Sequence, residues 1–206
     1  MSDDSGCRRA GATPSAAAGS GVPADGATGP LRLRRPRPED LEALAALEAR
    51  SYPPDEAAPR EVLADRIARA PACFLLAEGE DGALLGFVCG TRSAAPTLTH
   101  ASMREHDPAG ASLCIHSVVV DPAHRRRGLG RRLVAAYLER VGRDLSGVER
   151  VLLICKQHLV GFYEQNGFRL VGPSSVVHGR DPWFEMRRPL CPAGEGPRPP
   201  TAPRQA

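Results

Sequence analysis

The sequence has no long run of apolar residues. No window of the 206 residues approaches the roughly 18 consecutive apolar residues that a transmembrane helix needs. The chain begins Met-Ser-Asp-Asp, with acidic residues where a secretory signal would carry basic ones, and no long apolar segment follows. We therefore expect a cytoplasmic protein that neither spans nor binds a membrane.

The sequence also has little net charge, few aromatic residues and no closely spaced pair of cysteines. The formal net charge is only +3, whereas a duplex-binding domain clusters far more basic charge, so we expect no nucleic-acid partner. Aromatic residues make up 4% of the chain, which argues against a rich aromatic cage around a ligand. Six cysteines form no Cys-x-x-Cys pair, and in a reducing compartment they are expected to be small buried hydrophobes.

What remains is the composition of an ordinary globular protein, with 42% hydrophobic and 25% charged residues. The chain is long enough for one compact domain, which we expect to be monomeric. Residues 1–29 and 191–206 consist mainly of small residues, proline and glycine, which cannot bury enough surface to offset their ordering entropy. We predict disordered tails there, around a single domain at 30–190.

Hydrophobic periodicity inside the domain predicts the element order β α α β β β α β α β β. Gly-Glu-Asp-Gly at 79–82 separates two apolar runs and indicates a hairpin. This order predicts an α/β fold in which helices cover a mixed sheet. The predicted strands lie at 31–35, 72–80, 82–92, 111–121, 148–156, 169–172 and 181–190, and the predicted helices at 37–51, 59–70, 130–141 and 159–168.

Arginines and glycines are concentrated between a predicted strand and a predicted helix, in "VVVDPAHRRRGLGRRLV" at 118–134. Free N–H groups and the dipole at a helix N-terminus attract anions, and glycines allow close approach. A Rossmann pattern is excluded because its third glycine would fall at Leu133, and no Gly-Lys-Ser/Thr of a P-loop is present. The remaining motif, Arg-x-x-Gly-x-Gly from Arg125 to Gly130, predicts a phosphate site; the alternative is a solvated arginine face.

This stretch resembles the acetyl-CoA-binding motif of the GNAT superfamily of N-acetyltransferases. "FYEQNGF" at 162–168 matches the aromatic-Tyr-x-x-x-Gly-Phe segment of the same superfamily. The resemblance covers residues 31–190. It implies a central, mostly antiparallel sheet with helices on both faces and a splayed strand pair that binds acetyl-CoA.

Three further segments resemble the serotonin (arylalkylamine) N-acetyltransferase branch: "CIHSVVV" at 114–120, "LLICKQHLVGFYEQNGFRLVGP" at 152–173 and "WFEM" at 183–186. Tyr-Pro-x-Asp-Glu-Ala-Ala at 52–58 resembles the non-vertebrate and fungal members. The resemblance implies direct acetyl transfer, in a ternary complex, from acetyl-CoA to the primary amine of a small arylalkylamine.

Amine acetylation requires a neutral amine, and an alkylammonium has a pKa of about 10, so a base is needed. The two-residue period of a strand places Cys114, His116, Val118 and Val120 on one face. The branch has His-x-His on this strand; His116 matches the second histidine and Cys114 replaces the first. We interpret His116 as the base or proton relay, and Tyr163 matches the superfamily's general acid, the alternative being a core aromatic.

The site residues that follow form three groups. The catalytic group is His116, Tyr163 and Cys114. The resemblance assigns the acetyl-CoA site to Val118, Val119, Val120, Arg125, Arg126, Arg127, Gly128, Leu129, Gly130, Arg131 and Tyr163. It assigns the amine site to Tyr52, Pro53, Val118 and Ile154.

Other readings stay open at this stage. Asp55 and Glu56 would also attract a polyamine, although the same segment is equally typical of a polar linker between helices. A protein or peptide amine is a further acceptor class, and a non-catalytic acyl-CoA-binding domain is a different kind of function. We expect no cysteine acyl-enzyme at Cys114 or Cys155, because the resemblance implies direct transfer in a ternary complex. No fourth ligand completes a zinc site, so we expect no metal.

Overall fold

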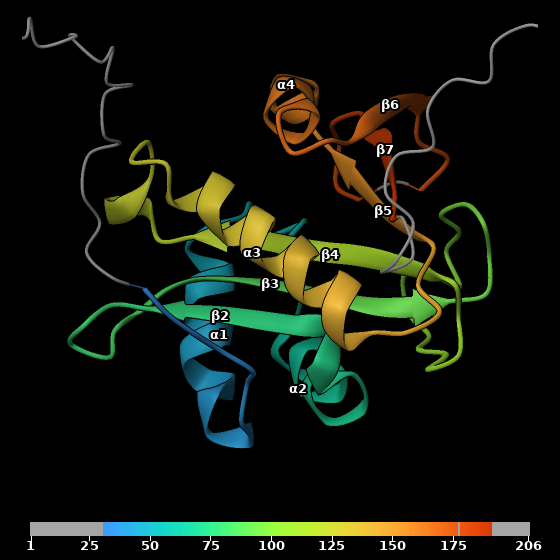
Figure 1. Ribbon diagram of the computed structural model, residues 1–206. Helices are drawn as coiled ribbons and strands as arrows, with labels where there is room; N and C mark the ends of the chain where they lie inside the picture. Colours follow the sequence, from blue (N-terminus) through green and yellow to red (C-terminus); the bar gives the residue numbers. More distant parts are fainter. Residues whose placement is uncertain (1–30, 177, 191–206) are drawn as a thin grey trace, which may run out of the picture.

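The computed structural model describes residues 31–176 and 178–190; the two predicted tails lie outside them. Within these residues the elements follow the predicted order (Figure 1). The strands are β1 (Arg32–Arg34), β2 (Phe74–Glu78), β3 (Leu84–Ser93), β4 (Ser112–Val120), β5 (Arg150–Cys155), β6 (Arg169–Pro173) and β7 (Phe184–Pro189). The helices are α1 (Leu41–Ala49), α2 (Arg60–Arg69), α3 (Leu129–Asp144) and α4 (Val160–Glu164).

The strands of the described residues form one sheet in the order β1-β2-β3-β4-β5-β7-β6. Five of its neighbouring pairs are antiparallel, and only β4 and β5 run parallel. The predicted hairpin is present, since β2 pairs with β3 and Gly82 adopts a φ of 79° in the turn. The predicted mixed, mostly antiparallel α/β fold is confirmed.

Helices cover both faces of the sheet (Figure 1). On one face, α1 and α2 bury Leu44, Leu47 and Leu63 against β2 and β3. On the other face, the predicted apolar side of α3 is buried together with Tyr163 of α4. Among the described helices, none combines the length and the apolar character needed to cross a membrane.

The sheet opens between its two parallel strands. β4 and β5 are paired only from Ser112↔Arg150 to Cys114↔Leu152, although β4 continues to Val120 and β5 to Cys155. Beyond Cys114, the edge of β4 that faces β5 therefore pairs with no strand of the described residues. This opening is the splayed strand pair that the family resemblance implied.

A β-bulge in β4 changes which side chains share a face. Ile115 pairs with Gly90 and Ser117 with Cys89, so His116 is an extra residue in β4. Because two residues of a bulged strand lie opposite one partner residue, strict alternation ends there. Ser117 therefore contacts Glu48 of α1, while Val118 packs against the core on the α3 face. The predicted common face of His116 with Val118 and Val120 is thus wrong.

Candidate active site

Two cavities meet where β4 and β5 diverge. The larger, of about 900 Å³, lies between α2, the α1–α2 loop, β4 and the β6–β7 loop. The smaller, of about 670 Å³, extends from the same place towards the β4–α3 loop and α4. Six residues line both cavities: Tyr52, Glu56, Val118, Ile154, Tyr163 and Trp183.

The smaller cavity ends at the arginine-glycine loop. Two residues of this loop have left-handed backbone conformations, Arg126 with a φ of 62° and Gly128 with a φ of 75°, and α3 begins directly after them. Successive N–H groups in such a turn, followed by a helix N-terminus, form an anion-binding concavity. Of the predicted loop residues, Arg125, Arg126, Gly128, Gly130 and Arg131 line the cavity, whereas exposed Arg127 and buried Leu129 do not.

The open edge of β4 forms a wall of the smaller cavity, through Val118, Val119 and Val120. The Tyr52 hydroxyl lies 3.4 Å from both the carbonyl oxygen and the amide nitrogen of Val118. The Tyr52 hydroxyl therefore contacts the backbone groups of Val118 with which an extended ligand would form hydrogen bonds. Pro53, predicted as an amine contact, lines the smaller cavity and not the larger one.

His116 lines the larger cavity as a neutral imidazole. Its Nε2 atom lies 2.8 Å from the Thr91 hydroxyl, which also lies 3.3 Å from the Ser102 carbonyl oxygen. A carbonyl only accepts, so both bonds form together when Thr91 donates to Ser102 and Nε2–H donates to Thr91. The lone pair is then on Nδ1, which is buried and has no hydrogen-bond partner in the described part of the chain. Burial, with a contribution from the charge of Arg66, lowers the pKa of His116 well below its ordinary value.

Glu48 is a buried carboxylate that sequence reasoning missed. It is 1% exposed, and its Oε1 atom accepts hydrogen bonds from the Ser117 hydroxyl at 2.9 Å and from the Ala58 N–H at 3.1 Å. Its Oε2 atom is buried without a partner among the described residues, and burial raises the pKa of the carboxyl. A signal was present in the sequence, because Glu48 falls at helical spacing with Leu44 on the apolar face of α1.

Tyr163 lies at the junction of the two cavities. It is 6% exposed and packs edge-to-face between Phe162 and Phe168, at ring-centroid distances of 5.0 and 5.7 Å. Burial raises the pKa of its phenol well above the ordinary value, so the hydroxyl keeps its proton near neutral pH. The structure therefore brings Tyr163 together with Ile154, His116 and Val118 around one space.

Cys114 is not brought into this space. It is fully buried among Leu98, Met103 and Leu152, and it lines neither cavity. Burial raises the pKa of its thiol to about 11, and that of Cys155 to about 11 as well. Both thiols are therefore protonated near neutral pH, a state in which cysteine is a poor nucleophile.

Two loops close one side of the junction. Glu56 of the α1–α2 loop forms an ion pair with Lys156 at 2.6 Å, and the Lys156 ammonium lies 4.1 Å from the centre of the Trp183 ring. The Trp183 Nε1–H donates to the carbonyl oxygen of His178, which comes from the same β6–β7 loop. The predicted acidic segment thus forms a cavity wall, and the charge of Glu56 is already paired.

Residues 41–168 match the model of the Acetyltransferase (GNAT) family. The chain belongs to this family. The solved structure of a GNAT-like decarboxylase, GphF, in complex with isobutyryl-CoA, matches with a TM-score of 0.68 and 28% identity, over 78% of this chain and all of that one. A phosphinothricin acetyltransferase from Sinorhizobium meliloti, in complex with AcCoA, matches with a TM-score of 0.58 at 19% identity, over 78% of this chain and 88% of that one, and shows the fold alone.

The predicted similarity to serotonin N-acetyltransferases is also confirmed. The enzyme from Mesocricetus auratus is 34% identical over 108 residues, which are 52% of this chain and 52% of that one. The human enzyme is 32% identical over 107 residues, 52% of this chain and 51% of that one. The chain therefore spans about half the length of the curated relatives that it matches.

Proposed function

We propose that this chain transfers the acetyl group of acetyl-CoA directly to the primary amine of an arylalkylamine. One observation carries the proposal: the cavity that ends at the arginine-glycine loop meets a second, larger cavity at Tyr163, beside the open edge of β4. Direct transfer needs two substrates to meet at one point, and this junction provides it. Membership of the GNAT family supports the reaction type, and the similarity to serotonin N-acetyltransferases supports the acceptor class.

The smaller cavity suits the coenzyme. In the proposal, backbone N–H groups of the β4–α3 loop bind the pyrophosphate, with Arg125, Arg126 and Arg131 adding positive charge. The unpaired edge of β4 from Val118 to Val120 binds the pantetheine arm as a neighbouring strand would. Because Tyr52 now contacts both backbone groups of Val118, its hydroxyl has to move when the arm pairs there.

The larger cavity suits the amine. Tyr52 and Trp183 supply aromatic surface at the junction, and Val118 and Ile154 supply apolar surface. The reacting nitrogen approaches the thioester carbonyl beside Tyr163. The new C–N bond forms as the C–S bond breaks.

Two side chains move the protons. His116 is neutral near pH 7 and accepts the proton that the amine loses, directly or through water. Tyr163 keeps its proton at neutral pH and donates it to the departing thiolate. Neither Cys114 nor Cys155 is needed as a nucleophile.

The first experiment is free-thiol release from acetyl-CoA by the purified protein, with tryptamine, serotonin, phenethylamine, spermidine and a lysine peptide as acceptors. Turnover with the aromatic amines is expected, together with the mass of the acetylated product. Turnover only with spermidine or the peptide would retain acetyl transfer and overturn the acceptor class. Coenzyme binding without turnover on any amine would favour the non-catalytic alternative.

The role of Tyr163 is tested by Tyr163→Phe, which removes only the hydroxyl. General acid catalysis contributes about 10² to 10⁴-fold, so kcat should fall by at least tenfold with little change in the KM for acetyl-CoA. The matched control is Tyr137→Phe: this hydroxyl is buried, bonds the Cys73 carbonyl at 2.9 Å and lines neither cavity. Equal kcat in both variants would show that Tyr163 is only a core aromatic.

A further inference from the structure

Arg66 lines the larger cavity and forms no ion pair with a carboxylate of the described residues. It projects from α2, and its guanidinium makes two long contacts, 3.9 Å to the Cys89 sulfur and 3.5 Å to the Met103 carbonyl oxygen. Both acceptors are uncharged, and none of the ion pairs formed by residues 31–176 and 178–190 includes Arg66. Its charge is therefore exposed to whatever fills the cavity.

The other arginines near Arg66 on α2 are paired. Arg60 lies 2.5 Å from Glu42, and Arg69 forms an ion pair with Asp65. Both pairs are on the outer surface, where water already screens charge and a pair contributes little. Asp65 is the sequence neighbour of Arg66, yet it pairs with Arg69. Among the described residues, α2 thus pairs its solvent-exposed arginines, whereas Arg66, which faces the cavity, forms no ion pair.

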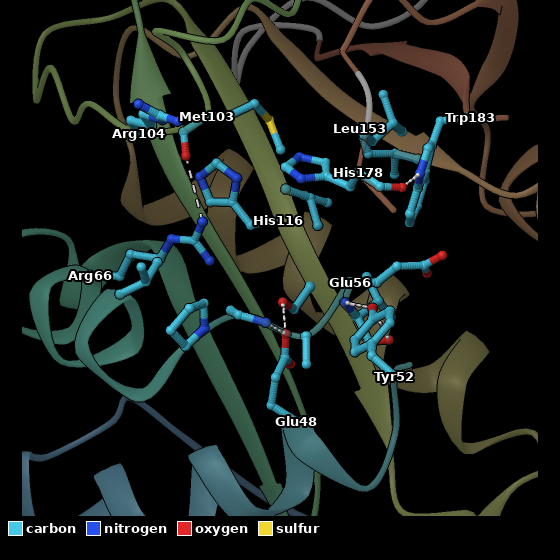
Figure 2. A pocket seen from close by; sticks show the side chains of 18 of the residues that line it. Glu48, Tyr52, Glu56, Arg66, Met103, Arg104, His116, Leu153, His178 and Trp183 are labelled. Carbon is cyan, nitrogen blue, oxygen red and sulfur yellow. Dashed lines mark hydrogen bonds between the residues drawn. The ribbon is translucent and has the colours of Figure 1, made fainter. Parts of the chain in front are cut away.

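Two histidines and a second arginine line the larger cavity together with Arg66, and the charge of Arg66 also acts on Glu48, whose pKa it lowers against the larger, opposite effect of burial. Figure 2 shows His116 of β4 beside Arg66, and His178 of the β6–β7 loop on the far side of His116. Burial and the charge of Arg66 lower the pKa of both imidazoles, so both are mainly neutral near pH 7. Arg104 lines the same cavity and adds a second guanidinium.

Five carboxylates line the larger cavity: Glu48, Asp55, Glu56, Glu61 and Asp65. Asp65 pairs with Arg69, and the ion pairs of residues 31–176 and 178–190 include neither Asp55 nor Glu61. Glu48 uses Oε1 for Ser117 and Ala58, and Glu56 pairs with Lys156. Glu48 keeps one unpartnered oxygen, but it forms no ion pair with Arg66 in the described part of the chain. The cavity therefore holds a free carboxylate oxygen and an unpaired guanidinium at separate points, which complements a ligand carrying both an ammonium and an anion.

A guanidinium recognises one anion geometry especially well. Its planar fork of N–H donors matches the two oxygens of a carboxylate, and such charge-assisted bonds are among the strongest in proteins. A partly buried cation without a counter-ion is unfavourable, so a ligand that supplies the counter-ion gains affinity at this point. A simple arylalkylamine has no group for this position.

We propose that the acceptor carries a carboxylate beside its amine, as an aromatic α-amino acid does, and that Arg66 binds this carboxylate. The inference rests on the proposed function and narrows its acceptor class. An aromatic α-amino acid has the arylalkylamine skeleton with one carboxylate added. Arg66 is a specificity-determining residue in this arrangement, and His116 and Tyr163 keep their roles.

The test uses three acceptors that differ only in this group: tryptophan with the carboxylate, tryptophanamide with a neutral group of similar size, and tryptamine with neither. Each is assayed by thiol release and product mass with the wild-type chain and with Arg66→Gln. Effects are compared between enzymes for each acceptor, so differences in amine pKa cancel. Removing a charged hydrogen-bonding partner should lower kcat/KM for tryptophan by about tenfold to a hundredfold. The losses for tryptophanamide and tryptamine should be at least fivefold smaller.

Two further variants sharpen the result. Arg66→Lys keeps the charge without the fork and should retain part of the activity on tryptophan. Arg60→Gln removes one arginine from the same helix outside both cavities, where its partner Glu42 also lies, and should leave the ratio of tryptophan to tryptamine activity as in the wild type. If Arg66→Gln does not fold, Arg66→Lys replaces it in the same comparison, and its loss should be larger for tryptophan than for tryptamine.

The outcomes separate this inference from the proposed function. Acetylation of tryptamine without acetylation of tryptophan would overturn the role of Arg66 and leave amine acetyl transfer intact. Equal losses of kcat/KM on all three acceptors would show that Arg66 stabilises the cavity but does not bind a carboxylate. No turnover on any amine would overturn the proposed function itself.

Discussion

At the scale of single residues, His116 shows how burial selects a protonation state. The lowered pKa keeps the imidazole neutral well into the acidic range, and its bond to Thr91 assigns the lone pair to Nδ1. A neutral base is available at every pH above that lowered pKa. Acetylation should therefore persist at mildly acidic pH, where an ordinary imidazole base would already be protonated.

We predict that kcat falls only as the pH drops through the lowered pKa of His116, below the ordinary value of about 6.5. In His116→Ala this acid limb should disappear and the rate should fall by about 10² to 10⁴-fold, because general base catalysis is lost. The measurement is kcat against pH at saturating amine. His124→Ala is the control, since His124 lines neither cavity. Full activity of His116→Ala at every pH would assign the proton transfer to another group.

At the scale of elements, β3 and β4 pack closely at the bulge in β4. Gly90 lies opposite the bulge, and a Cβ atom there would lie 2.6 Å from the Cys114 carbonyl oxygen and 3.1 Å from the Tyr137 hydroxyl. The first contact is with backbone, which cannot turn away as a side chain can. The absence of a side chain at Gly90 therefore keeps β3 and β4 at the distance that positions His116.

Gly90→Ala should destabilise the fold by about 1 to 3 kcal/mol, as overpacking of a core commonly does. Gly142→Ala is the matched control, because a Cβ atom at this position of α3 would meet nothing within 4 Å. The control should stabilise the fold by about 0.5 to 1 kcal/mol, since alanine favours a helix over glycine. Urea denaturation of both variants measures the two free energies of unfolding. Equal stability of the two would contradict the packing argument.

At the scale of the whole molecule, the coenzyme would connect the two parts of the sheet. β4 and β5 share only three paired positions, so a ligand between their diverging ends adds contacts that the unliganded fold lacks. A ligand that binds only the folded state raises its stability by mass action. Thermal unfolding therefore reports coenzyme binding independently of any acceptor amine.

Acetyl-CoA at about a hundred times its Kd should stabilise the fold by about 2.7 kcal/mol and raise Tm accordingly. Arg126→Gly should reduce this shift, because it removes a cavity-lining cation while glycine still adopts the local φ of 62°. Arg127→Ala, in an exposed position outside the cavity, should leave the shift as in the wild type. Scanning calorimetry with and without acetyl-CoA makes the comparison. The same shift in both variants would exclude a role for the Arg126 charge.

Local patterns in the sequence determined the element order, the buried faces of the helices and the Arg125–Gly130 loop. Periodicity, glycine and proline act over a few residues, so they are visible without a fold. Tyr163 and His116 were found through short motifs of the same kind. Even Glu48 left a local trace, as a charge on the apolar face of α1.

The tertiary structure alone decided what depends on contacts between distant segments. The bulge arises from the pairing of β4 with β3, and it moved Val118 away from the face of His116. Glu48, Arg66, Lys156 and His178 come from four separate segments, and their roles in the cavities follow from which charges meet and which do not. The sequence does not show whether an arginine forms an ion pair. Only the distances between their guanidinium groups and the nearest carboxylates distinguish Arg69 from Arg66.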